Sequence, residues 1–238
     1  MGDPQRAPDG PSHPDHFPPE EEDFNPSYVT PRNDVLALIP ETARCVLDLG
    51  CSSGELGAAL KERQGARVIG LEADPALAAV ARKRLDLVYQ VDLERADLDD
   101  LLSGETFDGL VLADILEHLT DPWRLLGAAV ACLDPDGWVL TSLPNVRHIS
   151  TLYQLGLRGE WPLRDRGIHD RTHLRFFTRR GIIALLEGAG LEVREERRNL
   201  RIVERIHTIN RFARWLDFPP LRPFFTFQYL HLARRRDP

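Results

Sequence analysis

One segment near the start of the chain, Val46 to Gly54 (VLDLGCSSG), constrains the fold more than any other part of the sequence. Its first half is an apolar run typical of a buried strand, and its second half encloses three small residues between Gly50 and Gly54. A glycine directly after a strand lets the backbone turn sharply and come close to a ligand. Because an ordinary strand-to-helix turn has the same pattern, this loop predicts a nucleotide site only together with other residues.

The remaining sequence alternates between short apolar runs and segments with helical spacing. The apolar runs predict seven strands, at residues 44–49, 67–71, 87–91, 107–113, 138–143, 191–195 and 224–233. The helical patterns cover residues 55–63, 75–85, 121–132, 146–157, 179–187 and 204–216. Strands that alternate with helices at this pitch predict an α/β fold, a doubly wound, Rossmann-like, mainly parallel sheet with helices on both faces.

Residues 1–27 differ in composition from the rest of the chain. They are acidic and rich in proline with few large apolar side chains, so we expect a disordered tail before one folded domain at residues 28–238. Seven acidic residues and one arginine precede Phe24, so the remainder is close to neutral although the whole chain carries −7. This lack of a basic excess argues against nucleic acid as a partner.

Three features indicate the compartment. No apolar run approaches the roughly 20 residues that a membrane-spanning helix needs. The first residues have neither the basic nor the apolar region of a secretory signal. The cysteines, Cys45, Cys51 and Cys132, match no disulfide or metal spacing and suit a reducing environment. We therefore expect a cytoplasmic protein.

Acidic residues follow the second and third predicted strands. Glu72 comes directly after one strand and Asp92 after the next. In a parallel sheet the carboxyl ends of the strands share one edge, where ligands bind. We expect Glu72 to accept hydrogen bonds from two ribose hydroxyls and Asp92 to meet an adenine amino group. A solvated carboxylate at one strand end is common, but features at three consecutive strand ends indicate a single site.

The glycine loop suits a cofactor without phosphates. It is not followed by the Gly-Lys-Ser or Gly-Lys-Thr of a phosphate-binding loop. The residues 51–53 also replace the glycine that lets a backbone touch a pyrophosphate. A cofactor with a ribose and a charged amino-acid end therefore fits better than ATP or NAD.

These residues, together with residues 112–119 (LADILEHL), resemble the class I methyltransferases, which use S-adenosyl-L-methionine. The resemblance spans about residues 29–233. It is closest to the branch that contains the ubiquinone-pathway O-methyltransferases and bacterial sugar and natural-product methyltransferases. Ser52 stands where the family more commonly has glycine.

The resemblance assigns cofactor contacts along the strand ends. The methionine end would be held by the loop residues Asp48, Gly50, Cys51, Ser52 and Gly54. The ribose would lie at Glu72, with Ala73 beside it. The adenine would lie between Asp92 and Leu93, and the floor would be Ala113 and Asp114.

Methyl transfer to a hydroxyl needs an acceptor held near the methyl group and a base that takes the hydroxyl proton. Three histidines are candidates for this base, namely His118, His169 and His173. Asp170 lies between the last two and could orient an imidazole. His118 could instead cap or pack a helix. His169, Asp170 and His173 could hold a divalent ion, but the arginines around them would repel a cation, so we predict no metal.

Two segments are predicted to lie on the substrate side, residues 158–177 and 199–222. The arginines of the first suggest a phosphate- or carboxylate-bearing substrate, and the candidate substrate contacts in this segment are Asp170, Arg171 and Arg175. A surface loop with internal ion pairs would have the same composition. Asn145 is a further candidate contact, with a turn residue as its alternative.

The pattern at residues 204–216 combines an apolar stripe with arginines. Such a helix is expected to pack on the core or to cover the substrate. A dimer contact or a membrane-surface contact are the alternatives, since a basic amphipathic segment and the later run Arg234–Arg236 suit peripheral binding. We expect a monomer or a homodimer.

The sequence therefore predicts an S-adenosyl-L-methionine-dependent methyltransferase that O-methylates a sugar-containing or other small polar metabolite, among them anionic or glycosylated acceptors. Two alternatives keep the activity and change the acceptor, a ubiquinone-type phenol O-methyltransferase and an amino-sugar N-methyltransferase. A third is a cofactor-binding regulatory partner without catalysis.

Overall fold

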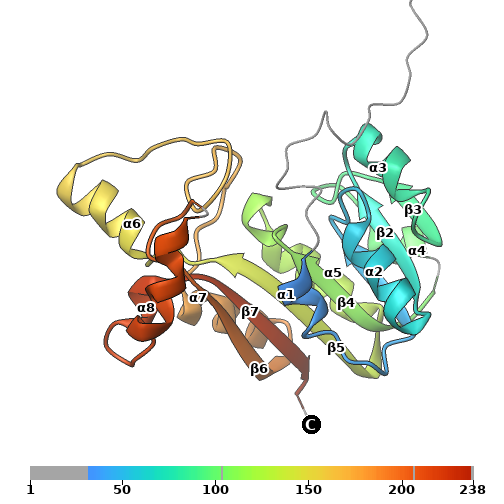
Figure 1. Ribbon diagram of the computed structural model, residues 1–238. Coiled ribbons are helices and arrows are strands. Elements are labelled where there is room, and N and C mark those ends of the chain that lie inside the picture. Colours follow the sequence, from blue (N-terminus) through green and yellow to red (C-terminus); the bar gives the residue numbers. More distant parts are fainter. Residues whose placement is uncertain (1–31, 103, 206, 237–238) are drawn as a thin grey trace, which may run out of the picture.

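The computed structural model describes residues 32–102, 104–205 and 207–236. It contains one seven-stranded sheet in the order β3-β2-β1-β4-β5-β7-β6 (Figure 1). The strands are β1 (Cys45–Leu49), β2 (Arg67–Glu72), β3 (Leu87–Gln90), β4 (Phe107–Ala113), β5 (Leu133–Pro144), β6 (Leu191–Leu200) and β7 (Thr226–Arg235). The first five pair in parallel, and β7 runs antiparallel to both of its neighbours.

Helices cover both faces of the sheet. The α-helices are α1 (Asn33–Leu36), α2 (Glu55–Gln64), α3 (Pro75–Ala81), α4 (Leu98–Leu102), α5 (Pro122–Ala131), α6 (Ile149–Thr151), α7 (Arg179–Gly188) and α8 (Arg222–Phe225). Buried residues of α1, α2 and α3 form one apolar cluster with the sheet, and those of α4, α5 and α7 form the other. The predicted doubly wound, mainly parallel α/β fold is confirmed.

The order of the sheet reverses at β1. The chain builds outwards from β1 through β2 to β3, and then returns to place β4 on the other side of β1. The loops after β1 and β4 therefore leave the sheet towards opposite faces, and the edge between them is open. Ligands bind at this edge in sheets of this kind.

Local sequence signals set several helix starts. The side chain of Asp74 accepts hydrogen bonds from the N–H groups of Ala76 and Leu77, and Pro75 occupies the first turn of α3. Asp121 caps α5 in the same way through the N–H of Arg124. These caps lie after the carboxyl ends of β2 and β4, so they help to fix the loops from which a ligand site is built.

The predicted α-helix at residues 204–216 is wrong. Residues 201–205 instead wrap around Asn210, whose side chain accepts hydrogen bonds from the N–H groups of Ile202 and Val203. A 3-10 helix, η4 (Thr208–Leu216), begins only after this turn. The reason is local, because the Asn210 amide also donates to the carbonyls of Val203 and Arg205, and an α-helix that began at residue 204 would have used the second of these carbonyls in its first turn.

Other boundaries differ from the prediction by a few residues. The last strand begins at Thr226, because the preceding residues form α8 with Pro223 in its first turn. The fifth strand begins at Leu133, earlier than the predicted residue 138, and residues 134–137 form a bulge inside β5, where the register with β4 shifts between Phe107 and Gly109. Residues 149–157 form α6 followed by a π-helical segment, η3 (Leu152–Leu157).

The predicted disordered tail, residues 1–27, lies outside the described residues. Within the three described ranges, no helix is both long and apolar enough to cross a membrane.

The centre of the sheet depends on one close contact between neighbouring strands. Gly109 of β4 lies against the indole ring of Trp138 of β5, and a methyl group at this glycine would overlap the ring. Trp138 is itself buried, at 3% exposure. The ring therefore takes the space that a side chain on β4 would need.

Gly109→Ala should lower the free energy of unfolding by about 1–3 kcal/mol, because the added methyl group overpacks the core. In a chain of this length each kcal/mol corresponds to a fall in Tm of roughly 2–4 °C. The matched control is Gly127→Ala on α5, where an added methyl group meets open space and should leave Tm unchanged or raise it slightly. Equal melting of the two variants would contradict the packing described.

Candidate active site

The loop after β1 folds back over the end of β2. Gly50 and Cys51 donate backbone hydrogen bonds to the carbonyl of Leu71, at 2.8 and 3.0 Å. Gly50, Ser52 and Gly54 all have left-handed backbones, with φ of 78°, 51° and 81°. At Gly50 a Cβ atom would lie 2.9 Å from the side chain of Ile115, so both conformation and space favour glycine there.

Glu72 fixes this loop from the end of the neighbouring strand. Its two carboxylate oxygens accept hydrogen bonds from the N–H groups of Ser52 and Asp74, both at 2.8 Å. Burial raises the pKa of Glu72, while these backbone donors act in the opposite direction. The carboxylate predicted to hold a ribose therefore also holds the loop predicted to receive the methionine end.

A second carboxyl group, Asp48, is buried close to Glu72. Burial raises the pKa of Asp48 to about 7, and the negative charge of Glu72 adds to this effect. Two carboxylates in a site of low polarity favour a ligand with positive charge, because a cation stabilises both in the ionised form. The ammonium and sulfonium groups of S-adenosyl-L-methionine meet this requirement.

The segment after β3 carries Asp92 and Leu93, which are predicted to flank the adenine of the cofactor. Leu93 is buried, and its carbonyl accepts a hydrogen bond of 2.8 Å from Arg124 of α5. Asp92 is exposed, accepts from the N–H of Glu94 at 3.0 Å and faces Arg95 at 3.7 Å. The structure thus places Asp92 and Leu93 after the end of β3, as expected, on a turn that Arg124 holds in position.

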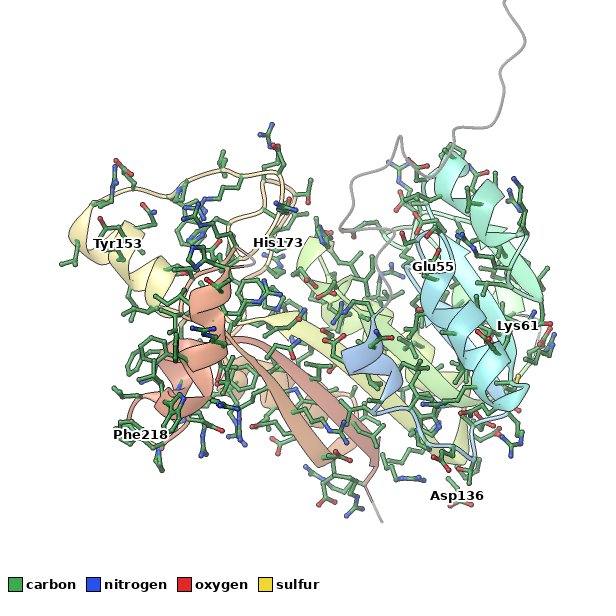
Figure 2. All side chains as sticks on the ribbon, viewed as in Figure 1. Glu55, Lys61, Asp136, Tyr153, His173 and Phe218 are labelled. Atoms are coloured by element: carbon green, nitrogen blue, oxygen red, sulfur yellow. The ribbon has the colours of Figure 1, made fainter. Side chains whose placement is uncertain are left out.

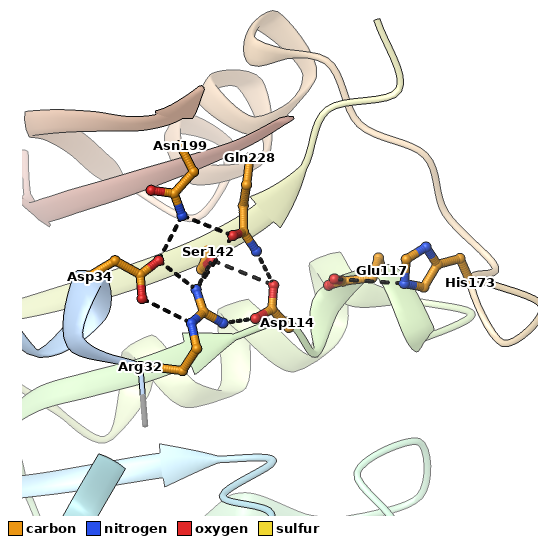
Figure 3. Close-up of polar contacts among 8 residues, drawn as sticks. All are labelled: Arg32, Asp34, Asp114, Glu117, Ser142, His173, Asn199 and Gln228. Carbon is orange, nitrogen blue, oxygen red and sulfur yellow. Dashed lines mark hydrogen bonds and ion pairs between the residues drawn. The ribbon is translucent and has the colours of Figure 1, made fainter. Parts of the chain in front are cut away.

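Asp114 follows β4 with a left-handed backbone, φ of 55°, and is bound through both carboxylate oxygens. Arg32 pairs with one oxygen, and Gln228 donates to the other (Figure 3). Arg32 also donates to Ser142 at 2.9 Å and pairs with Asp34 at 3.0 Å. The sequence pattern did not predict a role for Arg32, because it lies before the first strand and outside every motif.

The long loop that follows η3 brings His173 to the end of β4, where it lies beside His118. The backbone N–H groups of Leu174 and Arg175 donate to the carbonyl of Glu117, at 2.8 and 3.0 Å. Glu117 and His118 belong to a short 3-10 helix, η2 (Leu116–His118). Through this attachment the imidazole of His173 packs edge-on against His118, with ring centroids 4.7 Å apart.

Glu117 lies close to the two imidazoles. It is 1% exposed, and one of its oxygens is 4.0 Å from Nε2 of His173 (Figure 3; Figure 2 labels His173 on its loop). Burial raises the pKa of Glu117 to about 8, so its carboxyl is largely protonated near neutral pH. Burial also lowers the pKa of His118 and of His173, which favours neutral imidazoles.

A hydrogen-bonded chain orients His118. The hydroxyl of Thr172 donates to Asp170 at 2.6 Å and accepts from Nδ1 of His118 at 3.0 Å. A hydroxyl has one hydrogen to donate, so this geometry places the imidazole hydrogen on Nδ1 and leaves Nε2 as the basic nitrogen. Asp170 thus acts on His118 through Thr172, whereas the sequence had suggested that it orients His169 or His173.

His169 has a different environment. It is fully buried, and its Nδ1 lies 2.9 Å from a carboxylate oxygen of Glu204. The other oxygen of Glu204 pairs with Arg164 at 3.0 Å. These contacts attach the long loop to the turn before η4. They indicate that His169 stabilises the conformation of this loop.

The predicted substrate residues are also engaged within the protein. Both N–H groups of the Asn145 side chain donate to backbone carbonyls, of Pro223 and Thr226, at 2.8 and 2.7 Å. Its oxygen accepts from the N–H of Arg147. These contacts favour the turn-residue interpretation of Asn145. Arg171 pairs with Asp165 at 2.6 Å.

Arg175, the remaining candidate, donates to the carbonyl of Thr120 at 3.0 Å and lies over the ring of Trp123. It therefore fastens the loop to the start of α5. Of all the substrate-side candidates, His118, His173 and Asp170 are the ones that the fold brings together around the end of β4.

One group of described residues could also hold a metal ion. Glu117, His118 and His173 each offer one ligand atom, and these atoms lie within 4.8 Å of one another. Two imidazoles and a carboxylate suit a divalent ion. The set differs from His169, Asp170 and His173, which the sequence had suggested as the metal alternative.

Comparisons with known proteins identify the family of the chain. Residues 27–196 match a family described as a methyltransferase domain. A ubiquinone biosynthesis O-methyltransferase of Xylella fastidiosa is 31% identical over 196 residues, which cover 79% of this chain and 73% of the relative. The protein of the same description from Xanthomonas axonopodis pv. citri is 31% identical over 195 residues, covering 79% and 75%.

Solved structures show the same fold at lower identity. An S-adenosylmethionine-dependent methyltransferase from Mesorhizobium loti superimposes with a TM-score of 0.59 at 18% identity, covering 85% of this chain and 96% of the other. One from Archaeoglobus fulgidus gives 0.56 at 18%, covering 82% and 87%. The fold and the site define a class I methyltransferase. The chain belongs to the methyltransferase domain family and uses S-adenosyl-L-methionine as its methyl donor.

Glu72→Ala should weaken binding of S-adenosylhomocysteine by roughly tenfold to a hundredfold, because charge-assisted hydrogen bonds contribute about 1.5–3 kcal/mol. The variant removes both the predicted acceptor for the ribose and the acceptor for the N–H of Ser52. Titration calorimetry measures the change, with Glu62→Ala on the exposed side of α2 as the control. Unchanged affinity in Glu72→Ala would mean that the cofactor lies elsewhere.

Proposed function

We propose that the protein transfers the methyl group of S-adenosyl-L-methionine to a phenolic hydroxyl of an apolar aromatic acceptor, with His118 as the general base. The observation that carries the proposal is the chain from Asp170 through Thr172 to Nδ1 of His118, which leaves Nε2 of a half-buried imidazole as a proton acceptor. The base stands after the end of β4, a few residues from those assigned to the cofactor floor.

The chemistry is a displacement at the sulfonium methyl group. The hydroxyl oxygen forms the bond to the methyl carbon as the bond from carbon to sulfur breaks, and the sulfur leaves as a neutral thioether. The hydroxyl proton passes to Nε2 of His118. Because the methyl group is already activated, the protein contributes mainly position and a base of suitable pKa.

Two observations support a phenolic acceptor over the sugar-containing or polar metabolite expected from the sequence. That expectation rested on the arginines of residues 158–175, several of which pair internally: Arg158 with Glu160, Arg164 with Glu204, and Arg171 with Asp165. The relatives at 31% identity are also described as ubiquinone biosynthesis O-methyltransferases.

A panel of acceptors tests the proposal. Catechols with and without an alkyl chain, nucleotide sugars, glycosides and amino sugars are each incubated with S-adenosyl-L-methionine, and S-adenosylhomocysteine formation is measured. We expect turnover with the catechols, and faster turnover with the catechols that carry an alkyl chain. Turnover confined to sugars or amines would overturn the acceptor class. Cofactor binding without any product would favour the regulatory alternative.

His118→Gln should lower kcat by roughly a hundredfold or more, the usual contribution of a positioned base. Since burial lowers the pKa of His118 and the base must be neutral, the acidic limb of the rate profile should lie below pH 6.5 in the wild type. Thr172→Val should lower kcat, whereas Thr172→Ser should retain it, because only a hydroxyl group can form hydrogen bonds with both Asp170 and His118.

Two controls accompany these variants, and the second distinguishes a general base from a metal ligand. His207→Gln changes an exposed histidine and should leave kcat unaltered. Treatment with EDTA should also leave kcat unaltered. If His118→Gln retains full activity, proton transfer to this residue is unimportant. If EDTA abolishes activity and a divalent ion restores it, the cluster of Glu117, His118 and His173 acts as a set of metal ligands and His118 is not the base.

A further inference from the structure

The 3-10 helix η4 has three edges of different character, because side chains three residues apart lie along one line in such a helix. One edge faces the protein, with Ala213 only 1% exposed. A second edge is apolar and faces outwards, and it consists of Ile209, Phe212 and Trp215, which are 40%, 47% and 71% exposed. Trp215 and Phe212 also line a shallow apolar hollow with Ile202 and Leu216.

The third edge of η4 is basic, because it carries Arg211 and Arg214. Residues 205–216 contain three arginines and no acidic residue. The guanidinium groups of Arg211 and Arg214 lie over the rings of Phe212 and Trp215, at 4.6 and 5.8 Å from the ring centroids. Positive charge and exposed aromatic surface thus occur together on one side of a short helix.

The acidic residues that flank η4 pair with side chains other than Arg211 and Arg214. Glu204 pairs with Arg164 and His169, and Asp217 pairs with Arg222. They therefore do little to neutralise Arg211 and Arg214, and the edge of η4 that carries these two arginines keeps its positive charge.

A second exposed apolar segment is attached to the same region. In η3 the exposed side chains are Leu152, Tyr153, Leu155 and Leu157, the last at 81%. The start of α6 is tied to the turn before η4, since His148 lies 2.8 Å from the carbonyl of Arg201 and Ser150 donates to Glu204 at 2.6 Å. Tyr153 and Phe218 lie at the same end of the molecule, opposite Lys61 (Figure 2).

We propose that this end of the molecule, with η4 at its centre, is a peripheral docking surface for an anionic lipid bilayer. Aromatic side chains of this kind are enriched at the interface of a bilayer, where arginines pair with anionic headgroups. A second copy of the chain fits less well, because a two-fold contact would bring the basic edges of two copies together. The proposal is independent of the acceptor.

Cosedimentation of the full chain with vesicles tests the proposal. One set of vesicles contains equal parts of phosphatidylglycerol and phosphatidylcholine, and the other contains phosphatidylcholine alone. Arg211→Gln with Arg214→Gln should lower partitioning onto the anionic vesicles by about thirtyfold, because each basic residue near such a surface contributes about 1 kcal/mol. Phe212→Ser with Trp215→Ser should lower it by at least roughly tenfold.

Matched controls come from elsewhere on the surface. Arg82→Gln with Lys83→Gln removes two exposed charges from the end of α3, and Trp123→Ser removes an exposed tryptophan from α5. Both should bind vesicles as the wild type does. All variants should bind S-adenosylhomocysteine with unchanged affinity, which shows that they fold and separates this result from the catalytic proposal.

Several outcomes would overturn the proposal. The wild type could fail to bind anionic vesicles, or bind neutral vesicles equally well. The charge control could lose as much binding as the η4 pair, which would indicate general electrostatic attraction. Light scattering could instead reveal a dimer that dissociates in the Phe212 and Trp215 variant, which would identify a second copy as the occupant of this surface.

Discussion

The carboxylate of Glu72 organises the edge of the sheet where the cofactor is predicted to bind. It accepts hydrogen bonds from the loop after β1 and from the loop after its own strand, so two loops from neighbouring strands share one anchor. The loop after β1 needs such an anchor, because its residues with positive φ place the N–H of Ser52 outside the hydrogen bonds of a helix or strand, and Glu72 accepts from it instead. With Asp48 buried nearby, the anchor also gives the site the negative charge that a sulfonium cofactor complements.

The position of the cofactor residues could be predicted because parallel strands impose it. Asp48, Glu72 and Asp92 are far apart in the sequence, yet the pairing of β1 with β2 and of β2 with β3 brings their strand ends to one edge. Only apolar runs and the residues just after them are needed for that argument. Their contacts with a bound cofactor remain predictions.

Residues outside this regular pattern could not be found in the same way. Arg32 and Thr172 meet strand-end residues only through tertiary contacts, and neither belongs to a recognisable motif. The histidines illustrate the same limit, since His169 and His173 are four residues apart but pair with different partners, Glu204 and His118. Their environments depend on how a long loop attaches to η2 and to the turn before η4.

The three-residue period of η4 also limits how this segment can change in evolution. Inserting or deleting one residue within η4 would rotate the side chains after the change by about 120° around the helix axis relative to those before it. Such a change would exchange the buried edge that carries Ala213 with an aromatic or a basic edge. Substitutions can therefore accumulate along each edge independently, whereas changes in length should be tolerated only in multiples of three.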